Sequence, residues 1–136
     1  EENITGREIE VAVIGNETPV AMSRGEIIPG AEFYDYDAKY TDASTKLAIP
    51  ADLPEDVSES VRKAAVHAYS TLGCTGLSRV DFFLKEDGTI CLNEINTLPG
   101  FTSISMFSKL FGEVGISYME LIDKLIAYAE EKHNEK

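Results

Sequence analysis

Positive charge is scarce in this chain of 136 residues. Lys and Arg number 12 against 24 Asp and Glu, which gives a formal net charge of -12 at pH 7. Proteins that bind nucleic acid neutralise its phosphates with clustered Lys and Arg, so the composition argues against a nucleic-acid partner. The acidity does not exclude a nucleotide, because Mg2+ and a few local cations can screen its phosphates.

Cysteine and long apolar runs are scarce as well. Cys74 and Cys91 are too few for a disulfide framework or a zinc site, and reduced thiols fit a cytoplasmic location. No apolar run approaches the ~20 residues of a membrane span, so we expect no membrane partner. A signal peptide is also lacking, and the chain begins at Glu1 without Met. We therefore expect a domain-sized fragment of a longer protein.

The periodicity of apolar residues predicts an α+β fold. Alternation predicts strands over 8–14, 19–23, 26–28, 79–84 and 89–95. Three- and four-residue spacing predicts a helix over 54–72, and Ser117 with Glu120 forms a capping box that begins a last helix. We expect an antiparallel sheet with the helices packed on one face. The stretch 41–54 is predicted to be a long loop.

The stretch from Arg79 to Gly100 carries the candidate chemistry. Its two strands are joined by an Asp-Gly turn signal. Arg79 and Asp81 share one face, and Glu94 and Asn96 share another, because side chains two apart in a strand point the same way. If the hairpin brings these faces together, the oxygen ligands suit a Mg2+ that carries a substrate phosphate. The guanidinium would balance developing negative charge.

Simpler interpretations exist for the same residues. Acids near strand ends are commonly solvated, and Asn96 can begin a turn. Glu8 and Glu10 are expected in solvent on the face opposite the apolar residues of their strand. The hydroxyls around 102–105 can bind a carboxylate or cap a short helix, and the pattern supports both. Polar residues in matching phase within two apolar strands favour the metal and phosphate site.

Four segments together resemble the C-terminal part of D-alanine–D-alanine ligases in the ATP-grasp superfamily. They are GREIEVAVIGN, DAKY, LGCTGLSRVDFFL and LNEINTLPGFTSISM, which follow in the family's order over nearly the whole chain. The resemblance implies that residues 1–136 are the C-terminal ATP-grasp catalytic domain, without the family's N-terminal and central parts. It implies ATP-dependent ligation of two D-alanines through an acylphosphate, for peptidoglycan synthesis in the cytoplasm. The full-length enzyme would be a homodimer, and the fragment alone inactive.

The resemblance also implies roles at the phosphate end of the site. Asp81, Glu94 and Asn96 match the residues that hold a pair of Mg2+ ions (or Mn2+) on ATP, with Glu94 bridging the pair. Arg79 matches the arginine that contacts the transferred phosphate. The backbone N–H of Gly100 would help it stabilise the tetrahedral intermediate.

Further roles concern the substrates. Ser103, Ser105 and Met106 would bind the second D-alanine, with Ser105 on its carboxylate. Among the ATP-binding residues, Glu1 and Ile4 would contact adenine, Glu8 the ribose and Lys39 a phosphate. The pattern of the residues alone gives Lys39 no function. Tyr40, next to Lys39, is typical of the dipeptide-forming type. The catalytic set is thus Arg79, Gly100, Lys39 and Tyr40.

Two alternatives stay open. One is another ATP-grasp carboxylate–amine ligase with a different substrate, against which Ser103, Ser105 and Tyr40 argue. The other is a non-catalytic module that binds Mg2+ or a partner through its acidic face.

Overall fold

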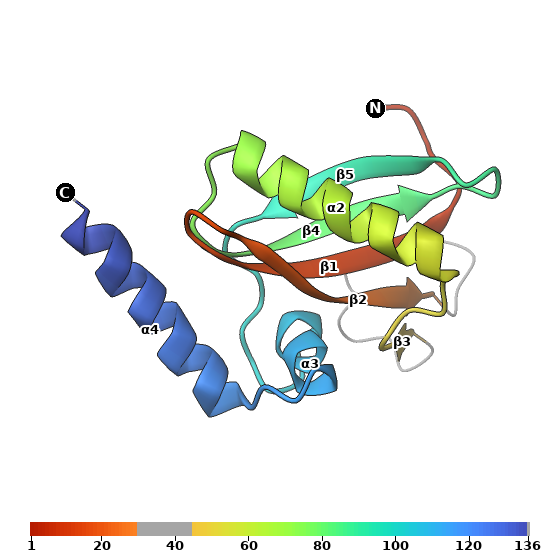
Figure 1. Cartoon of the computed structure of the whole chain (residues 1–136). Helices are drawn as coiled ribbons and strands as arrows, with labels where there is room; N and C mark the ends of the chain where they lie inside the picture. Colours follow the sequence, from red (N-terminus) through yellow and green to blue (C-terminus); the bar gives the residue numbers. More distant parts are fainter. Residues whose placement is uncertain (30–44, 136) are drawn as a thin grey trace.

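The computed structural model describes residues 1–29 and 45–135. In this part of the chain a single antiparallel sheet has the strand order β3-β2-β1-β4-β5 (Figure 1). The strands are β1 (Arg7–Gly15), β2 (Val20–Ile28), β3 (Lys46–Ala48), β4 (Gly76–Leu84) and β5 (Ile90–Asn96). The helices are α2 (Glu55–Thr71), α3 (Met106–Glu113) and α4 (Tyr118–Asn134). The predicted α+β class with an antiparallel sheet is confirmed.

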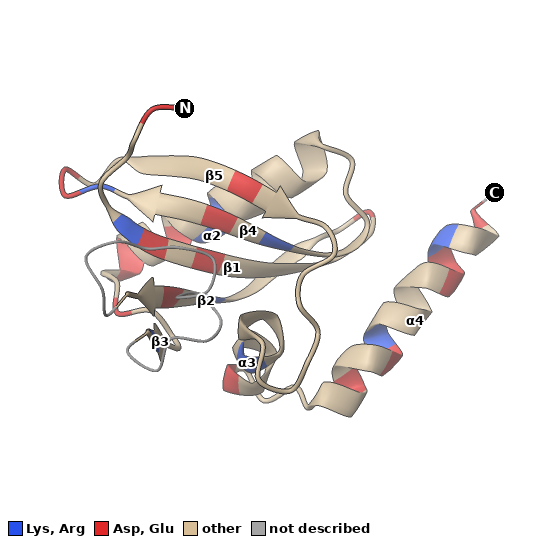
Figure 2. Cartoon of the chain, turned by 180° about the vertical axis from the view of Figure 1, so that it is seen from behind, with Lys and Arg blue, Asp and Glu red and all other residues tan. Residues whose placement is uncertain are grey.

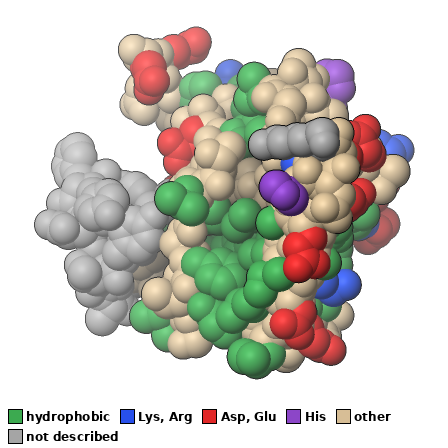
Figure 3. All heavy atoms as spheres, turned by 90° about the vertical axis from the view of Figure 1, so that its left-hand side faces the viewer, with side chains coloured by type: hydrophobic (Ala, Val, Ile, Leu, Met, Phe, Trp, Pro, Cys, Tyr) green, Lys and Arg blue, Asp and Glu red, His purple; other side chains and the backbone are tan. Residues whose placement is uncertain are grey.

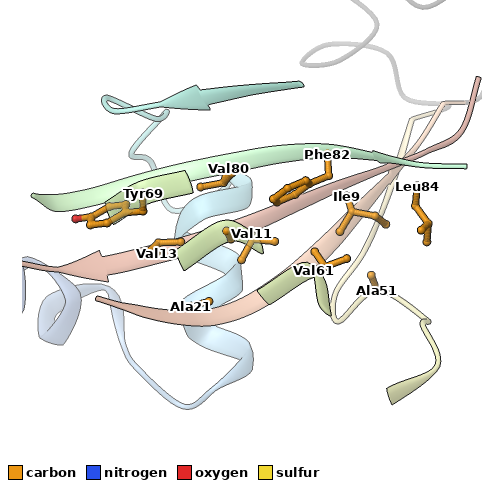
Figure 4. Close-up of a cluster of buried hydrophobic side chains, with 11 residues drawn as sticks. Ile9, Val11, Val13, Ala21, Ala51, Val61, Tyr69, Val80, Phe82 and Leu84 are labelled. Carbon is orange, nitrogen blue, oxygen red and sulfur yellow. The ribbon is translucent and has the colours of Figure 1, made fainter. Parts of the chain in front are cut away.

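Alternate residues of the central strand β1 face α2. Ile9, Val11 and Val13 are each 0% exposed and pack with side chains of β4 and α2 (Figure 4). The other buried members of this cluster are Ala21, Ala51, Val61, Ala65, Tyr69, Val80, Phe82 and Leu84. Burial of this size is the main stabilising contribution to a sheet-and-helix layer, because apolar surface leaves water.

The opposite face of the sheet is covered by α3. Ala12 and Ile14 of β1 are buried there together with Ile27. Against them pack Met106, Phe107, Leu110 and Phe111 of α3, and Leu121 of α4. The prediction that the helices cover one face is therefore wrong. Both faces of β1 are apolar beyond Glu10, and a strand of that kind is buried on both sides.

Two further predictions about strands need correction. β2 is one continuous strand instead of two short ones, because Arg24 and Gly25 stay paired with Val11 and Glu10 of β1. A Cβ on Gly25 would lie 2.7 Å from the Met106 sulfur, so the bare glycine lets α3 approach the sheet. In the predicted loop over 41–54, β3 pairs with β2, and residues 41–44 lie outside the described part.

The last helix begins as predicted. The Ser117 hydroxyl accepts a hydrogen bond from Glu120 N at 3.2 Å, and Ser117 N donates to Glu120 Oε2 at 2.7 Å. These bonds from Ser117 lower the pKa of Glu120.

Hydrophobic side chains gather on the side of the molecule where α4 lies (Figure 3). None of the described helices is both long and apolar enough to cross a membrane.

Tyr69 links α2 to the end of β1, and a Tyr69→Phe variant tests this link. The buried hydroxyl donates to the Gly15 carbonyl oxygen at 2.7 Å. Its loss should lower the free energy of unfolding by about 1 kcal/mol at pH 7. Burial raises the pKa of the Tyr69 phenol, so the wild type loses stability once the pH exceeds the ordinary value of about 10.

The difference in free energy of unfolding between the wild type and Tyr69→Phe should therefore shrink as the pH rises above about 10. Urea unfolding of both proteins at neutral and at alkaline pH measures it. A difference that stays constant or grows would contradict the assigned titration of Tyr69.

Candidate active site

The hairpin of β4 and β5 brings the predicted polar residues together on one face. Arg79 pairs with Asn96 and Asp81 pairs with Glu94 across the two strands. The prediction that these four side chains form one patch is confirmed. Acidic positions of β1, β4 and β5 lie next to one another across this face of the sheet (Figure 2).

A β-bulge at Asn93 makes this arrangement possible. Asp81 pairs with Glu94 but Phe82 pairs with Leu92, so Asn93 is the extra residue on β5. The bulge changes the phase of the strand by one residue. Ile90 and Ile95 therefore both pack against the α2 cluster, although they are an odd number of residues apart. Glu94 keeps its place on the opposite face beside Asp81.

Arg79 is the centre of the charged cluster. Its Nε donates to Asp81 Oδ1 at 2.9 Å and its Nη2 to Asp81 Oδ2 at 2.8 Å, a bidentate pair. Glu10 Oε2 lies 3.2 Å from the Arg79 Nε, and Glu94 Oε1 lies 3.9 Å from Nη2. The side chains of Arg79, Asp81 and Glu10 are 6%, 1% and 0% exposed, whereas Glu94 is 57% exposed.

The prediction that Glu10 faces solvent is wrong. Its alternation with Ile9 and Val11 predicts a polar face, but Ala12 and Ile14 share the face of Glu10 and are buried under α3. These two apolar residues in phase with Glu10 were the sequence signal that this face is covered. Glu10 is the site residue that the sequence interpretation missed.

The donor set fits a hard cation. Asp81 and Glu94 supply carboxylate oxygens and Asn96 an amide oxygen, on neighbouring strands, which are the oxygen ligands that Mg2+ takes together with substrate phosphates. Asp81 already accepts two bonds from Arg79, but a carboxylate has about four lone-pair sites. Within the described ranges, no three His, Cys, Asp or Glu side chains form a metal-binding group by themselves. A substrate phosphate and water would therefore have to complete the coordination.

Asn96 also begins a turn, as the simpler interpretation predicted. Its Oδ1 accepts a hydrogen bond from Leu98 N at 3.1 Å. This bond fixes the direction in which the chain leaves β5 toward Gly100. The two interpretations of Asn96 hold together, because its amide oxygen has a second lone pair.

A pocket of about 510 Å³ adjoins the charged cluster. Arg79 and Glu10 line it from the sheet, and the chain from Gly100 into α3 lines it from the other side. The remaining lining residues are Ile27, Thr45, Leu47, Thr102, Ile104, Ser105, Met106 and Lys109. The structure thus brings Arg79, Gly100, Ser105 and Met106 to one cavity. Ser103 is exposed and does not line it.

The Ser105 hydroxyl belongs to this pocket and does not cap α3. Ser105 stands at the N-cap position of α3, but its side chain makes no capping bond to the helix. Its Oγ instead accepts from Thr102 N at 3.1 Å and lies 2.8 Å from the Thr102 hydroxyl oxygen. A Cβ on Gly100 would lie 3.3 Å from the same Oγ. The capping interpretation of this hydroxyl is therefore wrong, and the interpretation as a carboxylate-binding group stays a prediction.

Of the predicted nucleotide-contacting residues, Glu1, Ile4 and Glu8 are not among those that line this pocket. Glu1 is exposed and Ile4 half-buried, and both precede β1. Glu8 pairs with Phe83 of β4 and, by alternation along β1, faces the same side as Glu10. Lys39 and Tyr40 fall outside the described residues.

Comparison with known proteins gives the family. The family model for the D-ala D-ala ligase C-terminus matches residues 1–127. A D-alanine–D-alanine ligase of Acetivibrio thermocellus is 59% identical over 99% of this chain. That match covers 36% of the relative, and a second relative is matched over 37%. The chain thus spans little more than a third of the length of these curated relatives.

Solved structures agree. The D-alanine–D-alanine ligase of Coxiella burnetii superposes with a TM-score of 0.85 at 39% identity, over 99% of this chain and 35% of that one. A D-Ala:D-Ser ligase of Enterococcus faecalis superposes with a TM-score of 0.83 at 40% identity, over 94% of this chain and 37% of that one. A Bacillus anthracis D-alanine–D-alanine ligase complexed with ATP superposes with a TM-score of 0.82 at 36% identity, over 99% of this chain and 43% of that one. The chain therefore belongs to the D-alanine–D-alanine ligase family and corresponds to the C-terminal part of its members.

Proposed function

We propose that the full-length protein containing this chain joins two D-alanines into D-alanyl-D-alanine, with ATP as co-substrate. The main observation in support of this proposal is the buried Arg79, which pairs with Asp81 and lines a pocket together with Gly100 and Ser105. Membership of the ligase family and the ATP complex of a structural relative support it. The dipeptide would serve peptidoglycan synthesis in the cytoplasm.

Asp81, Glu94 and Asn96 would hold a pair of Mg2+ or Mn2+ ions, with Glu94 bridging. Bound there, the metal would offset phosphate charge while the γ-phosphate of ATP passes to the carboxylate of the first D-alanine. Arg79 carries a permanent positive charge at the same place. We assign it to the transferred phosphate and, together with the Gly100 N–H, to the oxyanion formed when the second amine attacks the acylphosphate.

The other residues are proposed to bind substrates. Glu1 and Ile4 would contact adenine, and Glu8 the ribose hydroxyls. Lys39 would contact phosphate and Tyr40 would mark a dipeptide-forming site. Ser105 would bind the carboxylate of the second D-alanine, with Met106 beside it. Ser103, which is exposed, would assist in binding the same substrate.

The direct test of the function is product analysis with the full-length protein. Incubation with ATP, Mg2+ and D-alanine should release phosphate and D-alanyl-D-alanine in equal amounts. Absence of dipeptide from a folded protein that binds ATP would contradict the proposal. Residues 1–136 by themselves should form no dipeptide, because the relatives are about three times as long. Sedimentation of the full-length protein tests the homodimer that we propose for it.

A second candidate acceptor is D-serine. The D-Ala:D-Ser ligase structure superposes on this chain with a TM-score of 0.83, between the values of 0.82 and 0.85 for two D-alanine–D-alanine ligases. Offering D-alanine and D-serine together and separating the products by mass spectrometry discriminates the two. A mixed product formed in excess at equal concentrations would favour the D-serine acceptor.

Substitution of Ser105 by alanine should affect the acceptor selectively. A hydrogen bond to a charged group contributes about 1.5–3 kcal/mol, so the KM for the second D-alanine should rise roughly 10- to 100-fold. The thermal midpoint should change little, since the hydroxyl does not cap α3 and its two bonds to Thr102 are exposed to solvent. Steady-state kinetics at saturating ATP measures the effect.

Ser60→Ala is the matched control, because the Ser60 hydroxyl bonds within α2 to Asp56 O. It should leave both KM values unchanged. A Ser105→Ala variant with an unchanged KM for the acceptor would remove Ser105 from the substrate site.

A further inference from the structure

Glu10 is a buried carboxylate to which the proposed function assigns no part. Its side chain is 0% exposed and its Oε2 lies 3.2 Å from the Arg79 Nε. On β1 it stands between Asp81 of β4 and Gly25 of β2. Met106 lies over Gly25 on the face of the sheet that α3 covers. The Glu10 side chain beside it is therefore shielded from solvent although it lines the pocket.

Stability alone gives a weak reason for this residue. Burying a carboxylate beside a guanidinium costs desolvation energy that the attraction often fails to offset. Asp81 already forms the bidentate pair with Arg79 from the same strand. A second buried carboxylate on the neighbouring strand therefore calls for a functional reason.

The net charge of the cluster gives a functional reason for the second carboxylate. Three carboxylates surround one guanidinium, those of Glu10, Asp81 and Glu94. When all are ionised, two negative charges are in excess, so the cluster attracts divalent cations. A cation bound by Asp81 would draw electron density from that carboxylate and repel the guanidinium, which weakens the bidentate pair.

We propose that Glu10 is a positioning residue that keeps the Arg79 guanidinium at the pocket wall when Asp81 binds a divalent cation. The inference rests on the proposed function of this site. Glu10 suits the task because it approaches Nε from β1, on the side away from Glu94 of β5. Glu94 is 57% exposed and 3.9 Å from Arg79, so it holds the guanidinium less firmly.

Kinetics of the full-length protein give the first test. Glu10→Gln should lower kcat roughly 10- to 100-fold, as loss of partners that orient ligands in metal sites does, with little change in either KM. Glu26→Gln is the matched control, because Glu26 is 8% exposed and accepts two hydrogen bonds from Arg7 on the other face. It should leave kcat unchanged. An unaltered kcat in Glu10→Gln overturns the proposal.

A double-mutant cycle shows whether Glu10 acts through Arg79. In an Arg79→Lys background, Glu10→Gln should cause little further loss, because the bidentate group it positions is gone. An equal fold-loss in both backgrounds overturns the proposal. Glu10→Asp, which keeps the charge, should retain more kcat than Glu10→Gln, and the reverse order would also contradict it.

A measurement without turnover separates this inference from the proposed function. The 15N NMR signal of the Arg79 Nε–H, assigned through Arg79→Lys, is followed in full-length protein with Mg2+ and ADP. Glu10→Gln should shift this signal and speed its exchange with water, whereas Glu26→Gln should not. An unchanged signal overturns the positioning role. A shifted signal in a protein that forms no dipeptide supports Glu10 and refutes only the proposed reaction.

Discussion

Arg79→Lys in the full-length protein is expected to lower kcat for dipeptide formation about 1,000-fold, the range seen when an arginine or an oxyanion donor is lost. Lysine keeps the positive charge but cannot form the fork that meets both Asp81 oxygens at 2.9 and 2.8 Å. It also cannot hold Asp81 and reach the pocket from the same planar group. Single-turnover phosphate release measures the chemical step directly.

The control for this variant is Arg7→Lys. Arg7 forms a similar bidentate pair with Glu26, at 2.8 and 2.7 Å, away from the pocket. Its replacement should leave kcat within about twofold and act on stability only, in the range of 1 kcal/mol for a partly exposed pair. Equal losses of kcat in the two variants would show that the arginine pairs support folding and that Arg79 has no chemical role.

Asp81→Asn is expected to lower kcat roughly 100- to 1,000-fold and to raise the Mg2+ concentration needed for half-maximal activity. Asparagine retains the shape and one oxygen but removes the charge that attracts a hard cation. The substitution also leaves the buried Arg79 with Glu10 as its nearest fully buried carboxylate. Paramagnetic resonance of Mn2+ titrated into the protein with ADP reports metal affinity independently of turnover.

Asp87→Asn tests whether the effect is specific to the patch. Asp87 lies in the turn of the same hairpin, where its Oδ1 accepts from Thr89 N at 2.9 Å. The hydrogen bonds from Thr89 lower the pKa of Asp87, but asparagine can accept the same backbone bond. Mn2+ affinity should be unchanged in this variant. If Asp81→Asn also left Mn2+ affinity unchanged, the metal assignment would be wrong.

Most of the helices and strands could be predicted from the sequence, apart from β3 and the continuity of β2. The helix over 54–72 is observed as α2 at Glu55–Thr71, and the capping box of Ser117 and Glu120 begins α4. Such features depend on interactions within one turn or one strand, so the local residue pattern is enough to predict them. The patch of Arg79, Asp81, Glu94 and Asn96 was accessible for the same reason, since a hairpin joins neighbouring segments.

The sequence predicted only in part which side chains of β5 face each side of the sheet. The predicted strand over 89–95 is observed at Ile90–Asn96, but strict alternation places Ile90 and Ile95 on opposite faces. A bulge at Asn93 solves the conflict, and both isoleucines contact the core beside α2. Where a bulge forms depends on how the strand fits its partner, which local propensity does not encode.

What the sequence by itself determined is most of the helices and strands and the polar patch of one hairpin, because both follow from short-range spacing and residue type. The tertiary structure decided which faces are buried. It placed α2 and α3 on opposite faces of the sheet, enclosed Glu10 and brought Ser105 to Arg79 across a shared pocket. These contacts join segments separated by many residues, and burial depends on which element packs on each face. The role proposed for Glu10 became visible only at that level.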